Sequence, residues 1–221
     1  MKKVGLLLLI ILALLAINIF AKPLLGNSRK QTNVAEFNLL VSYTVEEGAK
    51  VPNGFADTVK KAQELLTKVF RSKEFKEALF KQSYNDSAYS KSKKACFLTV
   101  YDEKTGRISG EAVYQNLLKE KEVKLLLNIR NNGDKKGTMG ASYACSYQFT
   151  TYDYWLQEKG ELARRLARHI AHEFTHIRGY RHDNKVPKEF KWGRDVKEDP
   201  AYGVGNIVGE ILTEWGKKSL I

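Results

Sequence analysis

The sequence predicts a single α/β domain built on a mixed, twisted sheet. Its 221 residues are 43% hydrophobic and 28% charged, which is a normal composition for one globular domain. Segments rich in β-branched and aromatic residues alternate with segments whose apolar residues recur at helical spacing. No internal repeat and no shift in composition marks a second domain.

The first part of this domain is predicted to be a strand followed by a long helix. Residues 36–45 have the composition of a strand, and the breaker sequence at 52–54 ends that segment. Residues 55–80 are then predicted to form one helix. Its apolar stripe consists of Val59, Ala62, Leu65, Leu66, Val69 and Phe70.

The middle of the chain is predicted to contain three more strands and a short helix. The expected strands lie at 96–101, 122–129 and 143–151, and the short helix lies at 111–118. Polar or glycine-rich loops are expected at 82–94 and 131–140. A long helix over about 155–177 and a last helix over about 206–215 complete the domain, with an irregular stretch between them.

The first 21 residues have the pattern of an export segment. Lys2 and Lys3 precede an apolar run over 4–21 that ends in the small residue Ala21. The pattern predicts a cleaved signal peptide or an uncleaved membrane anchor, because about 18 apolar residues can just span a bilayer. A short linker at 22–35 then leads into the domain at 36–221. Both alternatives predict an exported domain that is secreted, periplasmic or anchored facing outward.

The net charge of +12 arises largely from lysines scattered along the chain, which is typical of a solvated surface. We therefore expect no nucleic-acid partner, and membrane contact only through an uncleaved N-terminal segment. Two cysteines, Cys96 and Cys145, suit an exported protein. They are compatible with one disulfide or with two buried thiols, and the sequence leaves both open.

Residues 172–182, HEFTHIRGYRH, contain the candidate metal-binding and catalytic residues. His172 and His176 are four residues apart, so on a helix they present two imidazoles on one face. Imidazoles are suitable zinc ligands, and the carboxylate of Glu173 is placed to act as a general base. On a continued helix His182 would be rotated about 240° away from His176.

Gly179 removes that obstacle, because glycine tolerates the left-handed conformation that ends helices. His182 can then return beneath the ion, and three histidines leave one coordination position open for water. The pattern therefore predicts one catalytic Zn²⁺ held by His172, His176 and His182.

The opposite face of this helix is apolar, as an active-site helix requires. Its buried stripe is predicted to be Leu162, Leu166, Ile170, Phe174 and Ile177. His169 lies two turns, about 10 Å, from His176, which is too far to share the ion. We expect His169 to be a packing residue or to support a ligand from behind.

This motif resembles the extended signature HExxHxxGxxH of the metzincin zinc metallopeptidases. The order of predicted strands and helices is also similar to that family. The resemblance implies a zinc-dependent endopeptidase with ligands His172, His176 and His182, and with Glu173 as general base. It implies a sheet-and-helix subdomain above a cleft and a small irregular subdomain after His182 that ends in a helix.

The resemblance also implies a peptide or protein substrate extended along the edge strand of the sheet. We expect residues 140–148 to form that edge. Metzincins carry a methionine in a turn below the zinc, whereas Met1 and Met139 both precede this motif. Residues 200–205 stand where that turn is expected.

Within 200–205, Tyr202 or Val204 is expected to fill the apolar floor under the imidazoles. Tyr202 is in addition a candidate catalytic residue that would reach the zinc or the developing oxyanion, with simple packing as the alternative. Asp183, directly after the third histidine, is a candidate for orienting a ligand, with a surface position as the alternative.

Other functions are compatible with parts of this pattern. A family of bacterial metal-dependent ribosomal-RNA maturation factors has HGxxHxxGYxH, which residues 179–182 resemble, but Glu173 replaces its glycine and export removes the protein from ribosomes. A catalytically inactive zinc-binding relative would suit the missing methionine but not the retention of Glu173. A gluzincin-type site would use Glu198 in place of His182, although residues 197–200 do not have a helical pattern.

Overall fold

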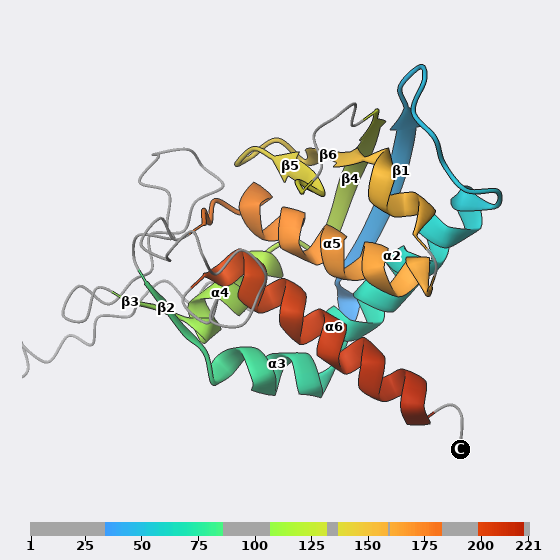
Figure 1. Cartoon of the computed structure of the whole chain (residues 1–221). Helices are drawn as coiled ribbons and strands as arrows, with labels where there is room; N and C mark the ends of the chain where they lie inside the picture. The colour runs from blue at the N-terminus through green and yellow to red at the C-terminus, as the bar shows by residue number, and fades with distance from the viewer. Residues whose placement is uncertain (1–33, 86–106, 132–136, 159, 183–198, 219–221) are drawn as a thin grey trace, which may run out of the picture. The chain divides into compact units, whose positions relative to one another are not determined.

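Four strands of the described chain form a mixed sheet in the order β1, β4, β6, β5 (Figure 1). The computed structural model describes residues 34–85, 107–131, 137–158, 160–182 and 199–218. The strands are β1 (Asn38–Val45), β4 (Glu122–Arg130), β6 (Gln148–Tyr152) and β5 (Gly140–Ser142). β1, β4 and β6 are parallel, and β5 is an antiparallel strand at the edge. The predicted α/β class with a mixed sheet is therefore confirmed.

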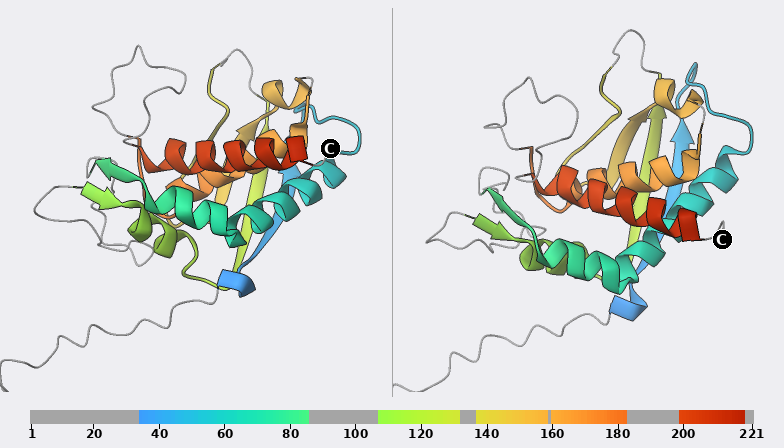
Figure 2. Two further views of the ribbon diagram at one scale, coloured as in Figure 1. Left: turned by 90° about the horizontal axis from the view of Figure 1, so that it is seen from below. Right: turned by 60° about the horizontal axis from the view of Figure 1, so that its bottom comes forward.

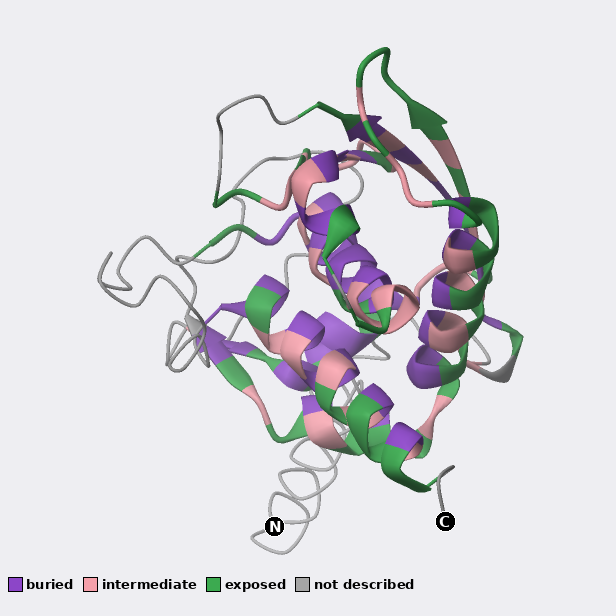
Figure 3. Ribbon diagram, turned by 45° about the vertical axis from the view of Figure 1, so that its right-hand side comes forward, coloured by how far each residue is buried: buried purple, intermediate pink, exposed green. Residues whose placement is uncertain are grey.

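One face of this sheet is covered by helices. The described α-helices are α2 (Phe55–Arg71), α3 (Lys73–Phe80), α4 (Gly110–Leu117), α5 (Leu162–Ile177) and α6 (Pro200–Lys218). Alternate residues of β4 are buried on the helix side, namely Val123, Leu125, Leu127 and Ile129. Helix α5 lies between the sheet and α6 (Figure 2), and more than half of its residues are buried (Figure 3). Helix α5, which carries His172, Glu173 and His176, is thus packed into the core.

The helix predicted over 55–80 is in fact two helices. Ser72 has an extended backbone, and its hydroxyl accepts a hydrogen bond from the Phe75 N–H as the N-cap of α3. Serine is a preferred N-cap residue, so the chain stops α2 and starts α3 at this position. The prediction of one uninterrupted helix was wrong at this residue.

One predicted strand begins later than expected, and three short strands were not predicted. The predicted strand at 143–151 begins only at Gln148, because Cys145 (φ 65°) and Tyr147 (φ 27°) have positive φ angles that a strand does not accommodate. The short edge strand β5 instead begins at the last residue of the predicted loop and ends before the predicted strand. A further antiparallel pair is formed by β2 (Ser83–Asn85) and β3 (Arg107–Ser109), which the sequence did not predict.

The helices near the motif are shifted relative to their predicted bounds. The first residues of the helix predicted from 155 form a 3-10 helix (Asp153–Gln157), and Gly160 (φ 120°) separates it from α5. The last helix begins at Pro200 and not near Asn206. The turn expected over 200–205 is therefore helical, which corrects that prediction.

Several predictions fall on residues outside the described ranges. These are the export segment, nearly all of the linker, the strand at 96–101 and the irregular stretch at 183–198. All described residues belong to one compact unit over 32–221. Cys145 is disulfide-bonded, and Cys96 lies outside the described residues. None of the helices in the described ranges combines the length and apolarity needed to cross a bilayer.

Candidate metal centre

The three motif histidines come together at the C-terminal end of α5. His172 and His176 lie one turn apart on the helix, and their ring centroids are 4.9 Å apart. One ring nitrogen from each of His172, His176 and His182 lies within 4.8 Å of the other two. The prediction that these histidines form one cluster is confirmed.

A Schellman turn at Gly179 brings His182 into the cluster. Gly179 has φ 104°, its N–H donates to His176 O at 2.8 Å, and the Tyr180 N–H donates to Thr175 O at 3.3 Å. This pair of bonds ends the helix and reverses the chain, as expected from the glycine. His176 and His182 then face each other with their Nε2 atoms 3.2 Å apart.

The second ring nitrogen of each histidine is held by the protein. His176 Nδ1–H donates to Tyr180 O at 2.7 Å, and His182 Nδ1–H donates to Asp199 Oδ2 at 2.9 Å. Both acceptors are oxygens without a proton to donate, so each of these two histidines keeps a proton on Nδ1 while its Nε2 faces the cluster. His172 hydrogen-bonds to the backbone of Ala201. Such outer partners are the usual means of orienting a metal-binding imidazole.

These three histidines could hold a metal ion. Two ligand nitrogens at about 2.0–2.1 Å from a tetrahedral ion lie about 3.3 Å apart, close to the spacing of the two Nε2 atoms. At this distance the two Nε2 atoms can share either a proton or a cation. Burial lowers the pKa of His172 well below its usual value and that of His176 to about 4, with the neighbouring His182 adding to the second shift. His172 and His176 are therefore neutral at pH 7, as metal binding requires.

Glu173 is buried beside these ligands, with 3% of its surface exposed. The Ser142 hydroxyl lies 2.7 Å from Glu173 Oε2 and 3.1 Å from the Glu173 carbonyl oxygen. Burial raises the pKa of Glu173 to about 7, although the Ser142 hydrogen bond and the charge of His182 act in the opposite direction. A carboxyl group with a pKa near 7 is suited to accept and return a proton.

Tyr202 lies against the imidazoles from the first turn of α6. Its ring centroid is 4.7 Å from those of both His172 and His182. Burial raises the pKa of its hydroxyl, and the charges of Asp199 and Glu173 raise it further, so the phenol keeps its proton. Val204, the other candidate for the floor, is fully buried.

His169 is a packing residue behind the site. It is buried against Trp155, with ring centroids 5.1 Å apart, and its Nε2 lies 2.6 Å from Thr151 Oγ1. Its Nδ1 lies 3.9 Å from Glu173 Oε1. Burial lowers its pKa to about 3, so this histidine is neutral at pH 7 and supports Glu173 without forming part of the cluster.

Two residues of the site escaped the sequence analysis. Ser142 lies 31 residues from Glu173 in the chain, and no local pattern pointed to it. Asp199 is buried and orients His182. Asp199 precedes Pro200, and an Asp-Pro pair is a typical start of a helix, so this signal could have been used. Asp183, the predicted candidate for orienting a ligand, and Glu198, the alternative third ligand, lie outside the described residues.

The edge of the sheet borders the site, as expected for residues 140–148. Among the described strands, β5 pairs with β6 alone and is the last strand of the sheet on this side. Ser142, its last residue, connects this edge to the Glu173 carboxylate. Within 140–148, the strand itself covers only Gly140–Ser142.

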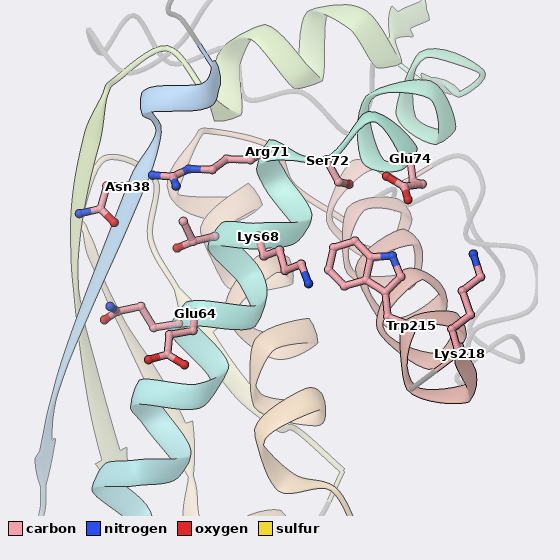
Figure 4. Close-up of a pocket in the computed structure, with 10 residues that line it drawn as sticks. Asn38, Glu64, Lys68, Arg71, Ser72, Glu74, Trp215 and Lys218 are labelled. Carbon is pink, nitrogen blue, oxygen red and sulfur yellow. The ribbon is translucent and has the colours of Figure 1, made fainter. Parts of the chain in front are cut away.

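A large concave surface of the described chain lies elsewhere. It has a volume of about 850 Å³ and lies between α2 and the end of α6 (Figure 4). Its lining includes Trp215 and Lys68, whose ammonium nitrogen is 4.8 Å from the centroid of the indole ring. None of the three clustered histidines lines it.

Comparison of the chain with protein-family models, with curated proteins and with solved structures found no match.

Proposed function

We propose that this protein is a zinc-dependent endopeptidase of the metzincin type. The observation that carries the proposal is the combination of three converging imidazoles with a buried carboxylate, Glu173, next to the first ligand in the helix. A structural zinc site is closed by four protein ligands, whereas a catalytic site has three and an open position. The three-histidine cluster therefore supports a catalytic ion.

Each residue has a defined task in peptide hydrolysis. When bound, a zinc ion supplies a Lewis acid that polarises the scissile carbonyl and acidifies water. Glu173 accepts a proton from the attacking water and returns it to the leaving amine. The Tyr202 hydroxyl, which stays protonated, donates a hydrogen bond to the developing oxyanion. The edge strand β5 pairs with an extended substrate backbone and brings it past Ser142 to the carboxylate.

The proposed substrate is a peptide or protein outside the cytoplasm. The lysine-flanked apolar run at residues 4–21 supports export. The retention of Glu173 favours a peptidase over an inactive zinc-binding protein and over a nuclease of the ribosomal-RNA maturation type. These alternatives predict zinc binding without cleavage of peptides.

The decisive experiment is cleavage of an unbiased peptide library by the zinc-loaded protein, read by mass spectrometry. Glu173→Gln should abolish the cuts, with a loss of about 10²–10⁴-fold in rate, because the amide cannot accept the proton. Glu210→Gln, which changes an exposed carboxylate on α6, is the matched control and should cleave like the wild type. Zinc content measured in all three proteins separates lost chemistry from lost metal. Cuts that persist in Glu173→Gln, or none from a zinc-loaded wild type, would refute the proposal.

A further inference from the structure

The buried carboxylate of Asp199 makes two kinds of contact, one with each of its oxygens. Its Oδ1 accepts hydrogen bonds from the N–H groups of Ala201 at 2.9 Å and Tyr202 at 3.2 Å. Its Oδ2 accepts the Nδ1–H of His182 at 2.9 Å. The Asp199 side chain is 1% exposed, so water does not replace either set of partners. One carboxylate thus caps α6 and holds the third motif histidine.

The first turn of α6 contacts the other histidines as well. The backbone of Ala201 hydrogen-bonds to His172, and the Tyr202 ring packs on both His172 and His182. A side chain at Gly205 would approach the Cβ of His172 to 3.3 Å, so α6 lies directly on α5 here. Any change in the position of this turn would therefore reach the cluster.

The hydrogen bond to His182 also selects a tautomer. A carboxylate can only accept, so it holds a proton on Nδ1 of His182 and leaves Nε2, which faces His176, as the nitrogen available to a metal. We propose that Asp199 is a positioning residue that couples metal binding at His182 to the formation of the first turn of α6. The inference rests on the metal-binding part of the proposed function and not on peptide cleavage.

The substitution Asp199→Asn should keep the capping of α6 but disturb the hydrogen bond to His182. Asparagine is as good an N-cap as aspartate, because its carbonyl oxygen can accept from the Ala201 and Tyr202 N–H groups. Its NH₂ group then faces the Nδ1–H of His182, donor against donor. The conflict is relieved if the His182 proton moves to Nε2, the nitrogen that the metal needs, or if the ring turns away. Asp199→Asn should therefore keep the start of α6 but weaken the binding of a metal ion by His182.

The test measures Zn²⁺ affinity by competition with a chelator for the wild type, Asp199→Asn, Asp199→Ala and Ser109→Ala. Loss of an outer hydrogen-bond partner typically weakens metal binding by about 10–100-fold, and we expect this for both Asp199 variants. Ser109 caps α4 through the N–H of Ala112 and serves as the matched control. Its removal should lower the melting temperature without changing Zn²⁺ affinity.

Hydrogen exchange tests the coupling itself. Zn²⁺ should slow exchange of the Ala201 and Tyr202 amides in the wild type, and much less in Asp199→Asn, because coupling between two sites is reciprocal. These amides should exchange faster in Asp199→Ala than in Asp199→Asn. The inference is overturned if Asp199→Asn binds Zn²⁺ like the wild type, or if Ser109→Ala weakens Zn²⁺ binding equally. A wild type that takes up no Zn²⁺ overturns both this inference and the proposed function, whereas zinc binding without peptide cleavage overturns only the latter.

Discussion

The Ser142 hydroxyl lies 2.7 Å from Oε2 of Glu173, and this contact joins the edge strand β5 to the buried carboxylate on α5. The two residues are 31 positions apart in the chain. A peptide that pairs with β5 would therefore be placed relative to Glu173 by the protein backbone itself. The Ser142 hydroxyl also restrains the position of the Glu173 carboxylate through Oε2.

Ser142→Ala should move the pH dependence of cleavage upward. Glu173 acts as a base only when deprotonated, and burial raises its pKa to about 7, so activity should fall as the pH drops through this region. The Ser142 hydrogen bond lowers that pKa, so its loss should raise it further and shift the acidic limb to higher pH. The measurement is kcat/KM against pH for both proteins. An unchanged acidic limb would show that Ser142 does not act on Glu173.

Removal of the metal should lower the thermal stability of the protein. An ion that binds only the folded state stabilises it by about 2.7 kcal/mol at a concentration 100 times Kd. For a domain of this size that corresponds to a rise of roughly 5–11 °C in melting temperature. Melting curves with a chelator and after addition of Zn²⁺ measure the effect. His182→Ala should show a strongly reduced response to Zn²⁺, and an equal response would remove His182 from the ligand set.

Tyr202→Phe should separate packing from catalysis at the floor of the site. Phenylalanine keeps the ring against His172 and His182 but has no hydroxyl. If the hydroxyl stabilises the developing oxyanion, kcat should fall by about 10²-fold, while KM and Zn²⁺ affinity change little. Steady-state kinetics and a zinc titration on the same preparations provide the comparison. Turnover equal to that of the wild type would leave Tyr202 with packing alone.

Arg178→Met should destabilise the fold. The Arg178 side chain is fully buried and donates from Nη1 to Glu120 at 2.7 Å and to the Tyr147 hydroxyl at 2.8 Å, and from Nη2 to Leu117 O at 3.1 Å. Its loss removes these hydrogen bonds, although the Tyr147 hydroxyl still donates to Glu120, and we expect a cost of about 2–4 kcal/mol in the free energy of unfolding. Urea denaturation measures this loss.

Glu120→Gln provides the comparison for the Arg178 variant. The carbonyl oxygen of glutamine can still accept from Arg178 and Tyr147, so this substitution removes the charge but keeps the hydrogen bonds and should cost less than Arg178→Met. A double variant should be less destabilised than the sum of the two single variants, because the residues interact directly. Additive losses would show that Arg178 stabilises the helix end by packing alone.

The cluster of histidines could be predicted because it depends on local geometry. His172 and His176 are one helical turn apart, and Gly179 supplies the positive φ angle that returns His182. Each of these relationships is set by residues close in sequence. The ends of the helices were predicted less well, since Ser72 and the Asp199-Pro200 pair act through side-chain caps that compete with the apolar pattern.

The sequence by itself determined the α/β class, the buried stripe of α5 and the three converging histidines with Glu173 beside them. Tertiary structure alone decided which distant groups complete the site. Ser142 reaches Glu173 only because β5 pairs with β6 at the edge of the sheet, and Asp199 reaches His182 only because α6 packs on α5. Periodicity along a chain reports which face of an element is buried. It carries no information about which polar group of another element meets that face, because that depends on how the elements pack.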